Sequence, residues 1–288
     1  MITIQVPATS ANLGSGFDTL GIALNLYAKF TFDKSNELLI EGCDKEYANE
    51  NNLIYQSYQK VFEKANQEVV PIHLLINSPI PLARGLGSSA TCIVVGVLAA
   101  NYYLDNKYSI DELFQIASDI EGHPDNIAPC MFGSFQASTN LNNKWIHTPF
   151  NCHKDLKFYA LIPNFELSTK KSREVLPKQV NYKDAVNNLS KLAFVIKGFA
   201  EANEDYLQLG LDDNLHQPYR FPIINDSEII LDYCKQHKLP VYLSGAGPTI
   251  MIVTTKEINL QPMLEHTQHT WTILPLLLDT KGYQIYEQ

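Results

Sequence analysis

The chain has 288 residues, of which 45% are hydrophobic and 18% are charged. This is enough for one large domain or two ordinary ones with real cores, and it excludes disorder as the main state. Asp and Glu (31) outnumber Lys and Arg (22), so the net charge is -9 and the chain repels phosphate-rich polymers at long range. Nucleic-acid binding is therefore not expected. Because a local cluster of donors can still hold a small anion, we expect a small-molecule partner.

The sequence shows no signal for export or for a membrane. Its first residues lack the basic stretch and apolar run of a signal peptide. The most apolar segment, 92–104, is interrupted by Asn101 and is shorter than the roughly 20 residues that span a bilayer. The cysteines are odd in number and widely spaced, with no CxxC pair: Cys43, Cys92, Cys130, Cys152 and Cys234. We therefore expect reduced thiols and a cytoplasmic protein.

The first third of the chain is rich in predicted strands. Residues 2–6, 22–32 and 73–76 have the apolar and aromatic content of strands. Asn52 is a predicted N-cap for a helix that precedes the last of these strands. The run that starts at Ser88 is apolar around most of a helical circumference, which predicts a helix buried at the centre of the fold.

A capping box at Ser109 and Glu112 begins another helix, which is predicted to end near Glu121. After Asn140 the pattern becomes polar, and we place the domain boundary near residue 150. The predicted domains are 1–150 and 151–288.

The second half opens with a predicted strand at 158–162. A helix follows, whose predicted apolar face is Ala185, Leu189, Leu192, Ala193 and Ile196. Another helix is predicted to end near Lys238, with strands at 241–243, 250–254 and 271–274. Strands and helices alternate on this modest scale in both halves, which predicts an α+β fold.

The strongest functional signal is the glycine-rich segment 81–90, PLARGLGSSA, which leads directly into the central helix. Glycines let the backbone approach an anion closely, and the first turn of a helix offers free N–H groups and a positive dipole end. Two serines before a helix can also act as caps alone. With Gly85 and Gly87 directly before them, we interpret the segment as a phosphate-binding loop.

Segment 81–90 also shares features with two other types of nucleotide-binding loop. A Walker A loop is excluded, because the segment has no lysine before its serines. Gly85-x-Gly87-x-x-Ala90 also fits the relaxed dinucleotide pattern, which should follow a hydrophobic strand and precede an acidic residue by about 20 positions. Prolines precede this loop instead, and Asp105 and Asp111 only straddle the acidic position. A dinucleotide site therefore stays open as the weaker alternative.

Two further segments combine glycines with polar side chains. Segment 7–21, PATSANLGSGFDTLG, presents Asn12 and Asp18 in tight turns, where such residues more often stabilise the turn than bind a ligand. Segment 244–248, SGAGP, lies between two apolar strands. It fits either a hairpin turn or a backbone that lies against a ligand.

Together and in this order, segments 7–21, 81–90 and 244–249 resemble the three motifs of the GHMP kinase superfamily, and within it the homoserine kinase family, over nearly the whole chain. One departure is Ser15, where the family has proline, and this change removes no functional group. The resemblance implies a ribosomal-S5-domain-2-like domain followed by a ferredoxin-like domain, with ATP and substrate between them, often in a homodimer.

The resemblance also implies that the glycine-rich loop wraps the phosphates of ATP. Ser89 and Glu121 match the residues that hold Mg²⁺, and hard oxygen donors suit that ion. Without the motifs around it, Glu121 would be interpreted as a solvated carboxylate at a helix end. The implied nucleotide-binding residues are Pro79, Ile80, Pro81, Leu82, Ala83, Arg84, Gly85, Leu86, Gly87, Ser88, Ser89 and Gly247.

The implied reaction is ATP-dependent phosphorylation of L-homoserine to O-phospho-L-homoserine, a step of threonine biosynthesis. The implied substrate-binding residues are Asn12, Asp18, His123, Asn126, Thr169, Arg173 and Arg220. Asp18, Ser89 and Glu121 are the implied catalytic residues. Related sugar and mevalonate kinases have an aspartate base where this chain has Asn126, and an amide cannot accept the proton. We therefore expect in-line transfer without a dedicated enzymic base.

Arginine usage supports an anionic group on the substrate. Only Arg84, Arg173 and Arg220 occur among the 22 basic residues. The planar fork of arginine binds carboxylate or phosphate in a way that lysine cannot. Arg84 lies in segment 81–90, and the resemblance implies that Arg173 in 168–173 and Arg220 in 216–220 bind a carboxylate. Ordinary surface ion pairing is therefore the weaker interpretation.

Three alternatives remain from the sequence. Another GHMP kinase would need Asp at position 126 and would not need the paired arginines. A nicotinamide-dependent oxidoreductase would use residues 85–90 as a dinucleotide site. A non-catalytic nucleotide sensor would have little use for Glu121 beside a complete set of substrate residues.

Overall fold

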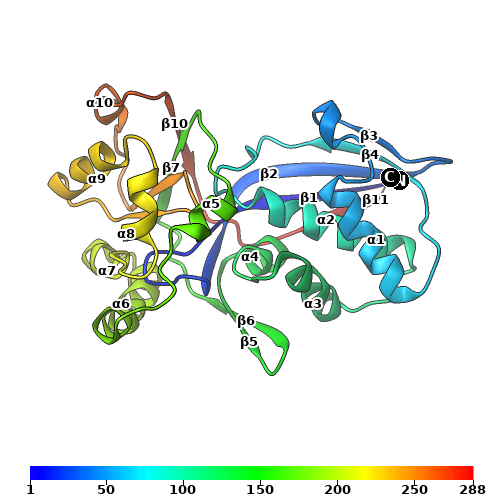
Figure 1. The fold of residues 1–288 in the computed structure, drawn as a ribbon, viewed down its shortest axis with the longest axis horizontal. Helices are drawn as coiled ribbons and strands as arrows, with labels where there is room; N and C mark the ends of the chain where they lie inside the picture. Colours follow the sequence, from blue (N-terminus) through cyan, green and yellow to red (C-terminus); the bar gives the residue numbers. More distant parts are fainter. Residues whose placement is uncertain (288) are drawn as a thin grey trace.

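The computed structural model describes residues 1–287, which fold into two antiparallel-rich sheets with helices (Figure 1). The larger sheet has the order β11-β1-β2-β4-β3, with β5 paired to β2 and β6 paired to β5. Its strands are β1 (Ile2–Ala11), β2 (Leu20–Lys34), β3 (Leu39–Glu41), β4 (Ile72–Asn77), β5 (Phe135–Leu141), β6 (Lys144–Phe150) and β11 (Gln284–Glu287). The three strands predicted in the first third are confirmed, and each is longer than predicted.

Four helices accompany this sheet: α1 (Leu53–Ala65), α2 (Ser88–Tyr103), α3 (Ile110–Glu121) and α4 (Ile127–Phe132). The predicted caps are confirmed, because Asn52 accepts from the N–H of Ile54 and the Ser109–Glu112 capping box closes in both directions. The N-cap of α2 is Gly87, and neither serine caps the helix. Neither serine hydroxyl is therefore occupied by capping this helix.

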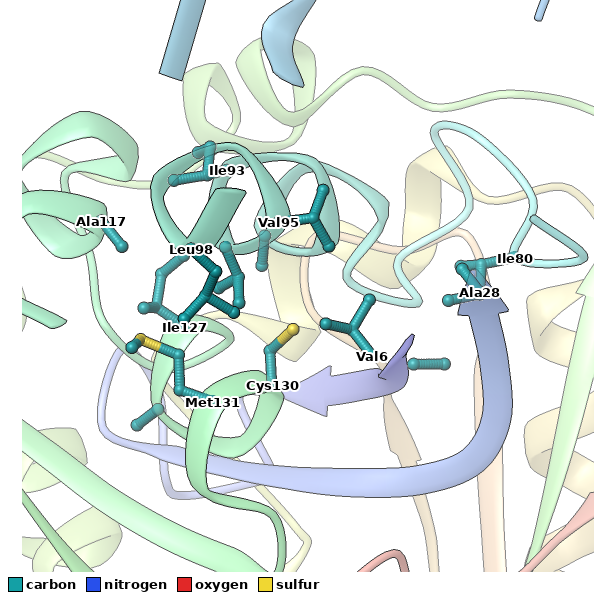
Figure 2. Packing of buried hydrophobic residues seen from close by; sticks show 14 of the residues in the cluster. Val6, Ala28, Ile80, Ile93, Val95, Leu98, Ala117, Ile127, Cys130 and Met131 are labelled. Carbon is teal, nitrogen blue, oxygen red and sulfur yellow. The ribbon is translucent and has the colours of Figure 1, made fainter. Parts of the chain in front are cut away.

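The α2 helix lies at the centre of the larger core, as its apolar composition predicts. Figure 2 shows its side chains Ile93, Val95 and Leu98 packed among residues of β1, α3 and α4. The helix approaches α1 so closely that a Cβ at Gly96 would lie 2.4 Å from the carbonyl oxygen of Ile54. Tight packing on all sides fixes the position of the first turn of α2, where the glycine-rich loop ends.

The second sheet has the order β10-β7-β9-β8, and its neighbouring strands are antiparallel. Its strands are β7 (Lys157–Pro163), β8 (Val241–Leu243), β9 (Ile250–Thr254) and β10 (Trp271–Leu276). Its helices are α5 (Thr169–Glu174), α6 (Tyr182–Glu201), α7 (Glu204–Gly210), α8 (Gln217–Arg220), α9 (Ser227–Gln236) and α10 (Gln261–Leu264). Short 3₁₀ turns occupy Lys45–Tyr47 and Phe221–Ile223. If the four strands of this sheet are numbered along the chain, they lie side by side in the order fourth, first, third, second. This is the strand order of the expected ferredoxin-like domain.

Alternation along β7 divides its side chains between two cores. Phe158 and Ala160 belong to the large core shared with the first sheet, whereas Tyr159 and Leu161 belong to a second core that includes residues of α9 and α10. The boundary predicted near residue 150 falls between β6 and β7, but β11 returns to pair with β1. The last residues of the chain therefore add a strand to the first sheet. The domain boundary itself stays a prediction.

The predicted face of the helix at 182–201 is wrong. Its buried residues are Asn188, Lys191, Val195, Gly198 and Phe199, and the predicted core residue Leu189 is 70% exposed. The polar residues are buried because they have partners: the Asn188 amide donates to Asp213 at 2.6 Å, and Lys191 forms an ion pair with Asp212. Leu189 and Ala193 are consequently exposed, whereas Leu192 is partly buried against the large core. None of the helices within residues 1–287 is both long and apolar enough to cross a membrane.

Candidate active site

A cavity of about 300 Å³ lies where the two halves of the fold meet. The glycine-rich loop and the first turn of α2 form one side, and segments from β1, α3, α5, α8 and the β8–β9 loop form the rest. All three motifs singled out in the sequence therefore contribute to one cavity. The contributing residues are Asn12, Ala83, Arg84, Gly85, Gly87, Ser88, Ser89, Glu121, His123, Asp125, Asn126, Leu167, Thr169, Arg173, Arg220, Gly245, Ala246 and Gly247.

The glycine-rich loop is held by backbone and side-chain contacts from both halves. Gly85 and Gly87 have φ of 78° and 73°, in the left-handed region that favours glycine. Thr9 donates its N–H to the carbonyl of Leu86 at 3.2 Å, and Ser244 donates its hydroxyl to the carbonyl of Gly85 at 2.6 Å. With its carbonyls occupied in this way, the loop leads into the N–H groups of the first turn of α2, as an anion site requires.

The structure divides the predicted nucleotide residues into two groups. Ala83, Arg84, Gly85, Gly87, Ser88, Ser89 and Gly247 line the cavity. Pro79, Ile80, Pro81, Leu82 and Leu86 are not among the lining residues. Ile80 and Leu86 are buried in the large core and anchor the loop. Arg84 donates to the carbonyl of Pro163 at 3.0 Å and pairs with Glu166 at 3.3 Å, so it ties the loop to the second half.

Ser89, in the first turn of α2, contacts Glu121, the last residue of α3. The Ser89 hydroxyl donates to Glu121 Oε2 at 2.8 Å. Burial raises the pKa of Glu121, while the Ser89 hydrogen bond and the nearby His123 oppose this shift. An added cation beside Glu121 would favour its ionised form, and the pair supplies two hard oxygen donors next to the N-terminal end of α2. These donors fit a Mg²⁺ ion, which takes few protein ligands and completes its shell with phosphate and water.

His123, Asp125 and Asn126 form one hydrogen-bonded turn after α3. The buried Asp125 carboxylate accepts from His123 Nδ1 at 2.9 Å and from the N–H of Asn126 at 3.0 Å. Burial lowers the pKa of His123, but the hydrogen bond and the charge of Asp125 outweigh it, so the net pKa is raised. The Thr9 hydroxyl donates to Asn126 Oδ1 at 2.7 Å. This contact orients the amide, whose Nδ2 has no hydrogen-bond partner within residues 1–287.

The two predicted carboxylate-binding arginines lie in the same cavity but in different surroundings. Arg173 is half-exposed and forms a bidentate pair with Asp18, at 3.1 and 3.3 Å. Arg220 is 1% exposed, and burial together with the nearby Arg173 lowers its pKa to about 10. Its Nε donates to the carbonyl of Ser172 at 3.2 Å and its Nη1 to the carbonyl of Gly245 at 3.1 Å.

Asn12 joins two of the motifs. Its amide donates to the carbonyl of Gly245 at 2.9 Å and accepts from the N–H of Asp18 at 2.8 Å. Asn12 and Asp18 both have positive φ, as expected of polar residues in tight turns. Asp18 does not line the main cavity. It lines an adjoining one together with His123 and Arg173.

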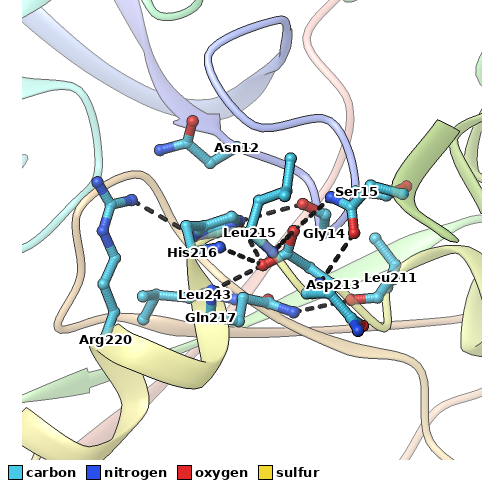
Figure 3. A network of polar contacts seen from close by, with 12 residues as sticks. Asn12, Gly14, Ser15, Leu211, Asp213, Leu215, His216, Gln217, Arg220 and Leu243 are labelled. Carbon is cyan, nitrogen blue, oxygen red and sulfur yellow. Dashed lines mark hydrogen bonds and ion pairs between the residues drawn. The ribbon is translucent and has the colours of Figure 1, made fainter. Parts of the chain in front are cut away.

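Sequence reasoning missed several residues that shape this site. Asp125 lies between His123 and Asn126, two of the implied substrate-binding residues, and this position is the signal that could have identified it. Asp213, His216 and Phe17 surround Arg220 and were also missed (Figure 3 shows the first two). An Asp a few residues before a Pro-containing helical turn is a typical helix start, and this pattern was available at Asp213.

Comparison with known proteins decides the family. Residues 52–134 match the description "GHMP kinases N terminal domain". The homoserine kinase of Clostridium beijerinckii is 41% identical over 297 aligned residues, covering 100% of this chain and 99% of that protein. The chain belongs to the homoserine kinase family. Another member, from Clostridium botulinum (strain 657 / Type Ba4), is 40% identical and covers 98% of this chain and 97% of its own.

The fold agrees with this membership. The crystal structure of homoserine kinase from Cytophaga hutchinsonii has a TM-score of 0.86 and 24% identity to this chain, covering 99% of it and 97% of the other chain. The likeness extends over both sheets, so the α+β prediction and the two-domain GHMP kinase fold are confirmed. As a family member, the protein is a kinase that uses ATP.

Proposed function

We propose that the protein transfers the γ-phosphoryl group of ATP to the hydroxyl of L-homoserine, giving O-phospho-L-homoserine for threonine biosynthesis. The observation that carries the proposal is the juxtaposition in one cavity of a phosphate-binding helix end with Arg173 and Arg220. One side of the cavity suits a polyphosphate, and the other suits the carboxylate of an amino acid. A kinase for a neutral sugar would have no use for this second side.

The zwitterionic ends of the substrate match the Arg173–Asp18 pair. The two residues hold each other in a half-exposed ion pair, which is worth little in free energy and is readily exchanged. A carboxylate on Arg173 and an ammonium on Asp18 would replace one ion pair by two. Asn12 and Thr169 also line the cavity and complete the proposed amino-acid site.

We propose direct in-line attack by the homoserine hydroxyl. Asn126 stands where a base would act and its amide cannot accept a proton, while the nearby Asp125 is already committed to His123 and the Asn126 N–H. Phosphoryl transfer has a loose transition state that depends mainly on positioning and charge neutralisation. His123 and Asn126 would orient the hydroxyl, and the N–H groups at Ser88 and Ser89 would neutralise charge on the phosphate.

Mg²⁺ is part of the proposal, with Ser89 and Glu121 as its protein ligands. When bound, the ion would supply positive charge that neutralises the charge developing on the phosphates. Within residues 1–287 no group of three or more His, Cys, Asp and Glu side chains could hold a metal by itself. A site of two protein oxygens completed by nucleotide phosphates agrees with that finding.

A cytoplasmic location and a homodimer are also proposals. The five cysteines are free thiols, which supports a reducing compartment. The outward face of α6 presents Tyr182, Val186 and Leu189 at spacings of four and three residues, and all three are exposed. Spacing of this kind is typical of a helix that packs against a second helix. A second copy of α6 is the proposed occupant.

The proposed function is tested by ADP release from purified protein. L-homoserine, mevalonate, galactose and shikimate are supplied separately with ATP and Mg²⁺. We expect release with homoserine alone and a product with the mass of O-phosphohomoserine. Release with another alcohol and not with homoserine would assign the cavity to a different GHMP kinase activity. A change in nicotinamide absorbance would support the dinucleotide alternative instead.

A further inference from the structure

Arg220 rests on a buried aromatic and polar network that the proposed reaction does not explain (Figure 3). His216 is fully buried and stacks on Phe17, with ring centroids 4.8 Å apart and planes 17° apart. The guanidinium of Arg220 lies 5.1 Å from the centroid of the same Phe17 ring. His216 Nδ1 faces Arg220 Nη1 at 3.4 Å, and its Nε2 faces the carbonyl of Gly14 at 3.1 Å.

The partners of the imidazole fix its tautomer. The carbonyl of Gly14 can only accept, so Nε2 must carry the proton, and the Asp213 carboxylate 3.6 Å from Nε2 favours the same assignment. Nδ1 is then unprotonated and can accept from Arg220 Nη1. Burial, aided by the charge of Arg220, lowers the pKa of His216 to about 4, although Asp213 opposes the shift. The ring is therefore neutral at neutral pH, as an acceptor from a guanidinium must be.

Asp213 fixes the segment that carries both residues. Its carboxylate accepts from the N–H groups of Leu215, His216 and Gln217 at 3.0, 2.7 and 2.7 Å. These bonds define the start of α8, whose last residue is Arg220. His216 and Arg220 are four residues apart and therefore lie on one face of this short helical segment.

The contacts of Arg220 leave one part of its fork for a ligand. Its Nε and Nη1 are bound by the carbonyls of Ser172 and Gly245 and by His216. In the described part of the chain, Nη2 has no hydrogen-bond partner, although Arg220 lines the cavity. Because the guanidinium group is planar, the partners that hold Nε and Nη1 also set the direction in which Nη2 points.

We propose that His216 is a positioning residue for amino-acid recognition: its unprotonated Nδ1, with Phe17 as a platform, holds the Arg220 fork so that the fork's remaining donor faces the substrate carboxylate. The proposal rests on the proposed function, because it assumes that Arg220 binds the carboxylate of homoserine. It assigns to His216 a role in selecting α-amino acids over simple amino alcohols.

Two partial analogues separate this role from a merely structural one. L-2-aminobutyrate keeps the carboxylate and lacks the hydroxyl, whereas 3-aminopropan-1-ol keeps the hydroxyl and the amine and lacks the carboxylate. Their inhibition constants against L-homoserine are measured in wild type and in His216→Ala. We expect His216→Ala to raise the KM for homoserine and the inhibition constant of aminobutyrate about tenfold, the effect of one charge-assisted hydrogen bond. The inhibition constant of aminopropanol and the KM for ATP should stay within about threefold of wild type.

Conservative variants keep the test decisive if His216→Ala does not fold. His216→Asn places an amide near the position of Nδ1, and His216→Gln places one near Nε2. We expect His216→Asn to retain a lower KM for homoserine than His216→Gln by about fivefold. His147→Ala is the matched control. The His147 ring also stacks on an aromatic ring, with its centroid 3.9 Å from that of Phe132, but His147 does not line the cavity. It should lower the melting temperature without changing the ratio of the two inhibition constants.

Equal loss of affinity for both analogues, or the same homoserine KM in His216→Asn and His216→Gln, would overturn the role of His216. A wild-type protein that does not phosphorylate homoserine would instead overturn the proposed function. The two failures are therefore distinguishable in one set of assays.

Discussion

At the scale of single residues, each ionisable group of the cavity has a partner that suggests its place in the reaction. Glu121 is bound to Ser89, His123 to Asp125, and Arg173 to Asp18. The partner of Arg173 is half-exposed and exchangeable, whereas Asp125 is buried and fixed. Asp18, the exchangeable partner, lies on the proposed substrate side. Asp125, the fixed partner, orients His123 and Asn126, which would hold the hydroxyl.

Arg220→Lys should weaken homoserine binding by about 1 to 3 kcal/mol, the range for a charge-assisted hydrogen bond. Lysine has a single nitrogen in place of the fork that now reaches Ser172, Gly245 and the cavity. Calorimetric titration with L-homoserine measures the change, and the affinity for ATP should be retained. Unchanged homoserine affinity would remove Arg220 from the proposed carboxylate site.

Glu121→Gln should raise the Mg²⁺ concentration for half-maximal activity by roughly 10- to 100-fold, the usual effect of weakening a metal site. Glutamine can keep the hydrogen bond with Ser89 but removes the negative charge. A magnesium titration of initial rates measures the shift. Glu112→Gln, in the capping box at the other end of α3, is the control and should leave the titration unchanged. Equal curves for Glu121→Gln and wild type would exclude Glu121 as a ligand.

At the scale of elements, the glycine-rich loop depends on the absence of a side chain at Gly87. A Cβ there would lie 1.9 Å from the Thr9 hydroxyl, which is itself bound to Asn126. Gly87→Ala should therefore lower the free energy of unfolding by about 2 to 4 kcal/mol, from backbone strain and overpacking together. Gly122 also has a positive φ, but a Cβ added there would meet nothing within 4 Å, so Gly122→Ala should cost only about 1 to 2 kcal/mol. Urea unfolding measures the free energy of unfolding of both variants. Equal decreases in the two variants would contradict a steric role for Gly87.

Elements with strong local signals could be predicted from the sequence, and others could not. The central α2 helix and the Ser109 capping box were predicted correctly because composition and spacing alone determine them. The strands β3, β5, β6 and β11 were missed: β3 and β11 are short, β6 is largely exposed, and β5 (FQASTNL) has no continuous apolar pattern. The face of α6 was predicted wrongly because the polar partners of Asn188 and Lys191 come from residues more than 20 positions away.

At the scale of the whole molecule, the site residues come from positions far apart in sequence. Motif order and the family resemblance predicted most of the residues that line the cavity, including Asn12, Arg173 and Arg220, but not Asp125 or Leu167. The buried network of Phe17, Asp213 and His216 could not be predicted, because its contacts depend on packing between the segment after β1 and the start of α8. Local spacing holds no information about such contacts between distant segments.

Acid should destabilise the whole fold through His216. Its pKa is lowered to about 4 in the folded protein, whereas an unfolded chain binds this proton below about 6.5. The unfolded state therefore binds more protons in this window, and the free energy of unfolding falls with decreasing pH by up to about 1.4 kcal/mol per unit. Urea unfolding between pH 7 and pH 4 measures the slope, which should be smaller in His216→Asn. Parallel slopes in the two proteins would contradict a buried neutral His216.

The assembly should depend on the outward face of α6. Leu189 is 70% exposed and lies with Tyr182 and Val186 on this outward face. Leu189→Lys should convert the proposed dimer into a monomer, because it places a charge at the centre of an apolar contact. Sedimentation velocity measures the mass, with Lys183→Glu at the polar edge of α6 as a control that tests charge alone. A wild-type monomer would contradict the proposed homodimer.

We propose that one cavity holds a triphosphate at the first turn of α2 and an amino acid between Arg173 and Arg220. A crystal structure with a non-hydrolysable ATP analogue, Mg²⁺ and L-homoserine tests it most directly. We expect the terminal phosphate within hydrogen-bond distance of the N–H groups of Ser88 and Ser89, and the carboxylate on both arginines. A carboxylate bound elsewhere, or phosphates away from the α2 end, would contradict the account.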